Sequence, residues 1–194
     1  MSAQEKSTSL SLLERVRGQD QEAWQRLIHL YGPLVARWCS LRCVRAQDAE
    51  DVQQEVFHAV ATSLHKFRLD RPGDTFRGWL RGITKNKLLD HHRRRHGQPE
   101  AQGGSEAQLG LLELAEQDLP EESEADLGAL YCRALELVRG EFEERTWNAF
   151  WRVTIDGHDP SDVASDLGVT SAAVRKAKSR ILHRLREEIG DLLA

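Results

Sequence analysis

Residues 162–186 combine two short helical patterns with a glycine between them, and the second pattern is strongly cationic. Six lysine or arginine side chains and no acidic one occur within residues 171–186. Such side chains pair with phosphate oxygens and with guanine edges in the major groove. Gly168 can supply the positive φ that closes a helix, and Thr170 or Ser171 can cap the next one. The pattern predicts a DNA-binding helix-turn-helix; the alternative is a solvated cationic helix, which usually mixes both signs of charge.

A second basic block occupies residues 77–95, where seven lysine and arginine residues accompany one acid, Asp90. Apolar residues recur among them at helical spacing, which predicts a helix from Thr75 to about Arg95. By contrast, residues 97–132 contain nine carboxylates and no lysine or arginine. The formal net charge of −4 and the pI of about 6.1 hide this segregation. Local charge decides contact with nucleic acid, so the overall balance does not exclude it.

Two other clusters of reactive side chains form no recognisable catalytic or metal site. Cys39 and Cys43 stand four residues apart, but a structural zinc site needs four ligands and no second pair follows. We therefore expect thiols packed in the core. The histidine- and arginine-rich residues 91–96 have no carboxylate cluster beyond Asp90, and we interpret them as a DNA-facing helix end. Without a phosphate-binding loop or a glycine-flanked serine, we expect no enzymatic activity, no metal and no cofactor.

Helical periodicity throughout the 194 residues predicts an all-α protein with two small domains and a flexible linker. The expected boundaries are residues 9–97 for the first domain, 98–124 for the acidic linker and 125–194 for the helix-turn-helix domain. Gly32 and Pro33 are expected to bend or restart the first long helix. The breakers Pro72 and Gly73 predict a loop over residues 69–74.

The cysteines and the polar N-terminus predict a cytoplasmic protein. An odd number of cysteines, three, argues against a disulfide framework. The first residues have no signal-type apolar core, and no apolar run approaches the roughly 20 residues needed to cross a bilayer. We therefore expect neither secretion nor membrane insertion.

The run AEDVQQEVF at residues 49–57 resembles the extracytoplasmic-function (ECF) group of sigma-70 family sigma factors of bacterial RNA polymerase. The order of parts is similar too, because FRGWLRGITKNKLLDHHRRR at 76–95, a variable linker and a helix-turn-helix follow. The resemblance implies that the helix containing this run docks on the polymerase clamp. The implied polymerase-binding residues are Asp48, Asp51, Gln54, Glu55 and Phe57. The alternative is that Asp51 and Glu55 are solvated and Phe57 is core.

For residues 76–95 the resemblance implies recognition and opening of the minus-ten promoter element. Phe76 and Trp79 are candidates for stacking on melted bases, worth roughly 1–3 kcal/mol per base, or else buried supports. Asn86 and Asp90 are candidates for base edges, and residues 69–75 for capture of an extruded base. The implied cations for the strand's phosphates are Arg77, Arg81, Lys85, Lys87, Arg93, Arg94 and Arg95.

The C-terminal helix-turn-helix resembles the domain that reads the minus-thirty-five element. Where many members have Thr-Val-Lys-Ser-Arg, this chain has AVRKA at 173–177, so a different base preference is expected. The implied DNA contacts are Ser171, Ala172, Arg175, Lys176, Ser179 and Arg180.

The implied partners are core RNA polymerase, promoter DNA and an anti-sigma factor or other inhibitor. The alternative function is a helix-turn-helix regulator that binds duplex operators without polymerase. We also hypothesise that the acidic linker passes near the polymerase cleft, in the place of nucleic acid.

Overall fold

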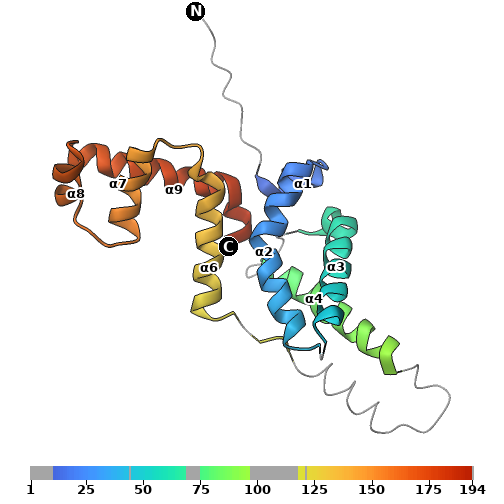
Figure 1. Cartoon of the computed structure of the whole chain (residues 1–194). Coiled ribbons are helices and arrows are strands. Elements are labelled where there is room, and N and C mark those ends of the chain that lie inside the picture. Colours follow the sequence, from blue (N-terminus) through green and yellow to red (C-terminus); the bar gives the residue numbers. More distant parts are fainter. Residues whose placement is uncertain (1–10, 44, 69–74, 97–117, 121, 194) are drawn as a thin grey trace, which may run out of the picture. The chain divides into compact units, whose positions relative to one another are not determined.

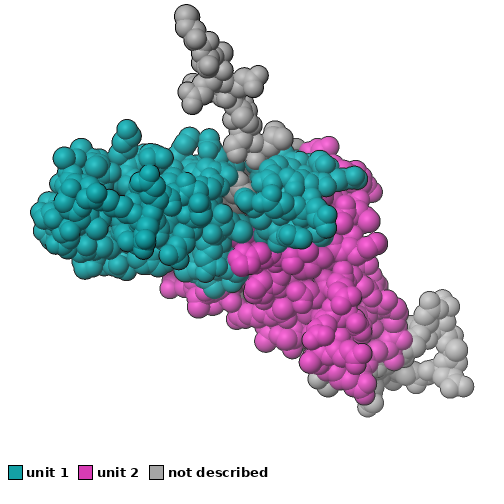
Figure 2. Space-filling model, turned by 45° about the horizontal axis from the view of Figure 1, so that its top comes forward, with its two compact units in different colours: residues 1–26, 128–193 teal, residues 27–127, 194 magenta. Residues whose placement is uncertain are grey.

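The computed structural model describes residues 11–43, 45–68, 75–96, 118–120 and 122–193 (Figure 1). Every regular element in these residues is a helix, which confirms the expected all-α class. The chain divides into unit 1, residues 1–26 with 128–193, and unit 2, residues 27–127 with 194 (Figure 2). The helices are α1 (Leu12–Arg17), α2 (Gln21–Ser40), α3 (Ala46–Ser63), the 3-10 turn η1 (Leu64–Lys66), α4 (Phe76–His96), α6 (Glu124–Arg139), α7 (Glu144–Thr154), α8 (Pro160–Leu167) and α9 (Ser171–Leu193).

The expected domain limits at residues 97, 98, 124 and 125 stay a prediction. Residues 97–117, most of the expected acidic linker, lie outside the described residues, as do residues 69–74, where a loop was expected.

The first helical region is interrupted at residues 18–20 and not at Gly32 and Pro33. α2 runs without a break through Pro33, so the expected restart there is wrong. Gly18 ends α1, and Gln19 has a φ of 62°, a left-handed value that a helix cannot continue through. The Asp20 carboxylate then accepts hydrogen bonds from the amides of Glu22 and Ala23, at 2.9 and 3.1 Å, and starts the next helix.

The core of unit 2 is built where α3 packs against α4 and aromatic rings from three segments meet. Tyr31 of α2 and Phe76 of α4 have ring centroids 5.1 Å apart in an edge-to-face arrangement. Phe67, which follows η1, lies 5.6 Å from Phe76 and 5.1 Å from Trp79. Such pairs add to the gain from burial alone. They fix the N-terminal part of α4, from which the predicted DNA-binding side chains project.

The helix-turn-helix of unit 1 is α8, a glycine turn and α9. Gly168 has a φ of 62°, and the amide of Val169 donates to the carbonyl of Ala164 at 2.9 Å, which satisfies the end of α8. Thr170 Oγ1 accepts the amide of Ala173 at 3.1 Å, so Thr170 is the expected cap. The buried side chains of Val163, Ala164, Val174, Ala177 and the α7 residue Ala149 form the core of this motif.

Within the described residues, no helix is long and apolar enough to span a membrane. The same residues hold no group of three histidine, cysteine or acidic side chains suited to a metal ion.

Candidate nucleic-acid and polymerase interface

The predicted polymerase-binding carboxylates lie on α3, but two of them are paired with α4. Glu55 Oε1 is 2.7 Å from Arg94 Nη2, and Asp48 forms an ion pair with Arg95. Asp51 and Gln54 are exposed to solvent. Of the predicted surface, Asp51 and Gln54 are therefore directly presented, while Asp48 and Glu55 also hold the C-terminal end of α4.

Phe57 is only 8% exposed and belongs to the core of unit 2. Phe57 therefore lies in the core, as the alternative interpretation expects. Its neighbour Val56 is fully buried, so this side of α3 faces inward. An anchoring role for Phe57 would need the surrounding core to open.

The two aromatic candidates on α4 differ in accessibility. Phe76 is 0% exposed and is surrounded by the rings of Tyr31, Phe67 and Trp79, so it presents no face to a base. The expectation that Phe76 stacks on a base therefore does not fit this conformation. Trp79 is half-buried. It is the aromatic candidate that can receive a base without unfolding the cluster.

Several of the α4 cations have carboxylate partners. Lys85 Nζ is 2.7 Å from Oδ1 of Asp118, which sequence spacing does not indicate. Arg93 Nη1 is 3.4 Å from Oδ1 of Asp90, one helical turn away. The Nε atom of Arg77 is buried without a hydrogen-bond partner among the described residues. The side chains of Arg81 and Lys87 are half-buried, and those of Asn86 and Asp90 are exposed. α4 thus carries a basic surface on which Lys85, Arg93, Arg94 and Arg95 each have a carboxylate partner.

The predicted DNA contacts on α9 differ in their exposure and in the contacts that they make within the described residues. Arg175, Lys176 and Ser179 are exposed, and Ser171 lies half-buried at the helix start beside the exposed Ala172. Arg180 is also exposed but lies over the ring of Phe142, with Cζ 5.9 Å from the centroid. Buried residues on the opposite side, such as Ile181, hold α9 in place. The polar side of the first two turns of α9 is therefore exposed to solvent.

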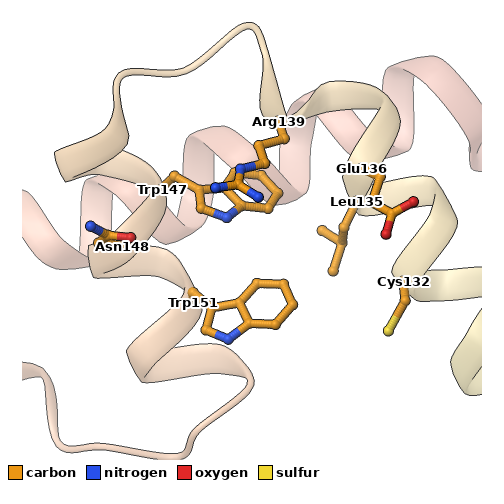
Figure 3. A pocket seen from close by; sticks show the side chains of 7 residues that line it. All are labelled: Cys132, Leu135, Glu136, Arg139, Trp147, Asn148 and Trp151. Carbon is orange, nitrogen blue, oxygen red and sulfur yellow. The ribbon is translucent and has the colours of Figure 1, made fainter.

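A pocket of about 290 Å³ between α6 and α7 was not predicted from the sequence (Figure 3). Trp147 and Trp151 of α7 face Leu135 and Cys132 of α6 across it (Figure 3). The guanidinium of Arg139 lies over the Trp147 ring, 6.0 Å from its centroid. The signal in the sequence was the pair of tryptophans one helical turn apart.

Comparison with known proteins agrees with these features. Residues 27–97, which contain α3 and α4, match the family described as sigma-70 region 2. Over 188 residues the chain is 31% identical to the ECF RNA polymerase sigma factor SigD of Mycobacterium tuberculosis, covering 91% of this chain and 81% of SigD. The chain belongs to the ECF sigma factors. This sigma factor is also 34% identical over 174 residues to SigE of Mycolicibacterium smegmatis, covering 89% of this chain and 62% of SigE.

Two solved structures are similar to this sigma factor at lower identity. A chain of the RsbN–BldN complex is 18% identical with a TM-score of 0.37, covering 89% of this chain and 96% of that one. A chain of the structure of CnrH with the cytosolic domain of CnrY is 24% identical with a TM-score of 0.37, covering 90% and 92%. As a member of the ECF family, this sigma factor acts in transcription initiation.

Proposed function

We propose that this sigma factor directs bacterial core RNA polymerase to specific promoters from the cytoplasm, and catalyses no reaction itself. The observation that carries the proposal is the opposite charge of two packed helices in the region 2 match. α3 presents carboxylates, and α4, which packs on it, presents lysines and arginines. A single unit can then bind a protein through one helix and nucleic acid through the other.

The acidic side of α3 is the proposed polymerase contact. Asp51 and Gln54 are exposed one turn apart, and Asp48 and Glu55 continue the same side. Charged rims steer association and fix the register of a complex. The proposal places the buried Phe57 behind this rim as a support.

The basic side of α4 is the proposed contact for the melted minus-ten strand. Trp79 offers a stacking surface, and Arg77, Arg81, Lys85 and Lys87 offer cations to the phosphates. Asn86 and Asp90 are exposed beside them and can hydrogen-bond base edges. Phe76 packs against Trp79 inside the aromatic cluster, with ring centroids 5.7 Å apart.

The first turns of α9 are the proposed contact for the upstream element, in a domain of residues 125–194 joined to residues 9–97 by a linker. Arg175 and Lys176 can pair with guanine O6 and N7, while Ser171 and Ser179 make shorter contacts. Exposed cations in two separate modules also suit an inhibitor that covers both, so an anti-sigma factor is the proposed regulatory partner.

The test is reconstituted transcription with bacterial core polymerase over a random promoter library. We expect Asp51→Ala to lower factor-dependent transcription and polymerase affinity about tenfold, a change of roughly 1.4 kcal/mol. The matched control is Glu50→Ala, which removes an exposed carboxylate one residue away on α3. If both variants behave as the wild type, α3 is not the polymerase contact.

The same assay tests the upstream module. Arg175→Ala with Lys176→Ala should change the selected upstream sequence and leave polymerase affinity intact, because only DNA contacts are lost. Arg186→Ala removes an exposed cation farther along α9 and should leave the selected sequence unchanged. If the purified protein binds no core polymerase yet occupies duplex sites unaided, it is an ordinary helix-turn-helix regulator instead.

A further inference from the structure

Residues 118–120, here called the strap, lie on unit 2 against the proposed DNA-binding helix. Asp118 Oδ1 is 2.7 Å from Nζ of Lys85 on α4. Arg42, just after α2, donates from Nη2 to the Asp118 carbonyl oxygen at 2.8 Å. The next side chain, Leu119, is only 3% exposed. Two polar contacts and one buried leucine therefore hold the strap, although it has no regular secondary structure.

The charge at this contact resembles that of a phosphate on the same cation. The hydrogen bond and charge of Lys85, with a weaker contribution from Arg81, hold the pKa of the Asp118 carboxyl below its usual value. Asp118 is therefore an anion at neutral pH, and its side chain is 81% exposed. Lys85 and Arg81 are two of the four cations that the proposed function assigns to the melted strand. The strap thus presents an anion at a place where a DNA phosphate would bind.

We infer that the strap is an internal competitor of promoter DNA, which must leave Lys85 before a melted strand can bind there. The inference rests on the proposed function, because only that function assigns Lys85 to DNA. A site that is open for a fraction of the time binds with its affinity reduced by that fraction. The strap therefore lowers the affinity of the factor for single-stranded DNA.

The contacts set the size of this effect. An exposed ion pair is weak, so the carboxylate alone can be displaced by a phosphate chain with several charges. The buried Leu119 gives the strap a hold that does not depend on charge. Removal of either contact should raise the open fraction, but only removal of Asp118 changes the local charge. This difference separates competition by the strap from simple repulsion of DNA by a nearby acid.

The experiment measures binding of a fluorescent single-stranded minus-ten oligonucleotide to the full-length factor, alone and in complex with core polymerase. We expect Asp118→Asn to bind about two- to five-fold more tightly than the wild type, the range an exposed ion pair supplies. Leu119→Ala should bind more tightly as well, without any change in charge. The matched control Glu122→Gln removes a carboxylate four residues along, which forms no ion pair among the described residues, and should bind as the wild type does.

Hydrogen exchange at the Leu119 amide gives a second measurement that does not depend on affinity. We expect exchange in the wild type to become faster when the oligonucleotide is added. Equal affinities for Leu119→Ala and wild type, with unchanged exchange at Leu119, would overturn the inference and leave the proposed function standing. If no variant binds the oligonucleotide in either setting, the proposed DNA site fails, and the inference fails with it.

Discussion

Arg94 Nη2 of α4 lies 2.7 Å from Glu55 Oε1 of α3, and thus joins the proposed DNA-binding helix to the proposed polymerase-binding helix. A second pair, Arg95 with Asp48, joins the same two helices, and His91 Nε2 is 3.9 Å from that aspartate. Under the proposed function, each of these carboxylates would have to exchange its arginine on α4 for polymerase. A polymerase that takes the carboxylate would then leave the arginine available to a DNA phosphate.

We expect the Glu55–Arg94 pair to contribute little to stability. The two side chains are 34% and 58% exposed, so solvent screens their attraction. A double-mutant cycle with Glu55→Gln, Arg94→Gln and both should give a coupling of about 0.2–1 kcal/mol in the free energy of unfolding. Urea denaturation measures it. A coupling of several kcal/mol would mean that the pair is far better shielded than its exposure indicates.

Substitutions at Phe76 and at Trp79 should affect different properties, namely the stability of the protein and its affinity for DNA. Phe76→Leu removes contacts from a fully buried ring and should cost about 1–3 kcal/mol of stability, with oligonucleotide affinity unchanged. Trp79→Leu should lose about 1–3 kcal/mol of oligonucleotide binding, because a stacking surface is removed. Thermal unfolding and fluorescence anisotropy measure the two effects. The reverse outcome, with folded Phe76→Leu losing the oligonucleotide, would return Phe76 to the DNA site.

Gly168→Ala should destabilise the helix-turn-helix by about 1–2 kcal/mol, the cost of a left-handed residue with a Cβ. The φ of Gly168 is 62°, and an added Cβ would lie 3.5 Å from Arg145 Nη2, an ordinary contact. Backbone strain is therefore the main cause. Gly140→Ala is the control, because its φ is not in the left-handed region and its Cβ would meet nothing within 4 Å. Equal melting temperatures for the two variants would contradict this explanation.

The cysteines should differ in reactivity and in their effect on the pH dependence of stability. Burial, with a smaller effect of Cys43, raises the pKa of Cys39 to about 12. The folded state then keeps a proton that the unfolded state loses, so the free energy of unfolding should fall between about pH 9 and 12. Cys39→Ala should reduce this slope, and Cys132→Ala, at an exposed site, should not.

Thiol labelling gives an independent check of the same burial. At neutral pH a thiol reagent should modify Cys132 first and Cys39 only after unfolding, because the thiolate of Cys39 is both inaccessible and disfavoured. Rapid labelling of Cys39 in the folded protein would contradict its placement in the core.

Local chemistry made the helix-turn-helix predictable. Gly168, Thr170 and the apolar spacing from Val174 each act within one or two helical turns, and the structure has them in the expected roles. The sequence predicts a bend or a restart at Gly32 and Pro33, whereas the helix is interrupted at residues 18–20. Gly18 and Asp20 are residue types that end and begin helices, so the sequence contains a signal for the interruption. A proline inside a helical pattern predicts an interruption more strongly, and it therefore directed the prediction to Pro33.

The charged pairs of the candidate site could not be predicted, because they join residues far apart in the sequence. Lys85 and Asp118 are separated by 33 positions and Glu55 and Arg94 by 39. Helical periodicity assigns each side chain to a side of its own helix and says nothing about the segment opposite. For the same reason the spacing of Phe76 and Trp79 left open which of the two rings is buried.

The internal engagement of two α9 arginines has a consequence for how duplex binding responds to ionic strength. Arg184 binds Glu141 through Nε and Nη2 at 2.6 and 2.8 Å, and Arg180 lies over Phe142. Each phosphate neutralised by a protein cation releases condensed counterions, and their number sets how steeply affinity falls as electrolyte is added. Because a carboxylate holds Arg184, binding of this helix to DNA should release fewer counterions than its six cations suggest. The affinity for the upstream element should therefore fall less steeply when the ion concentration of the cell rises.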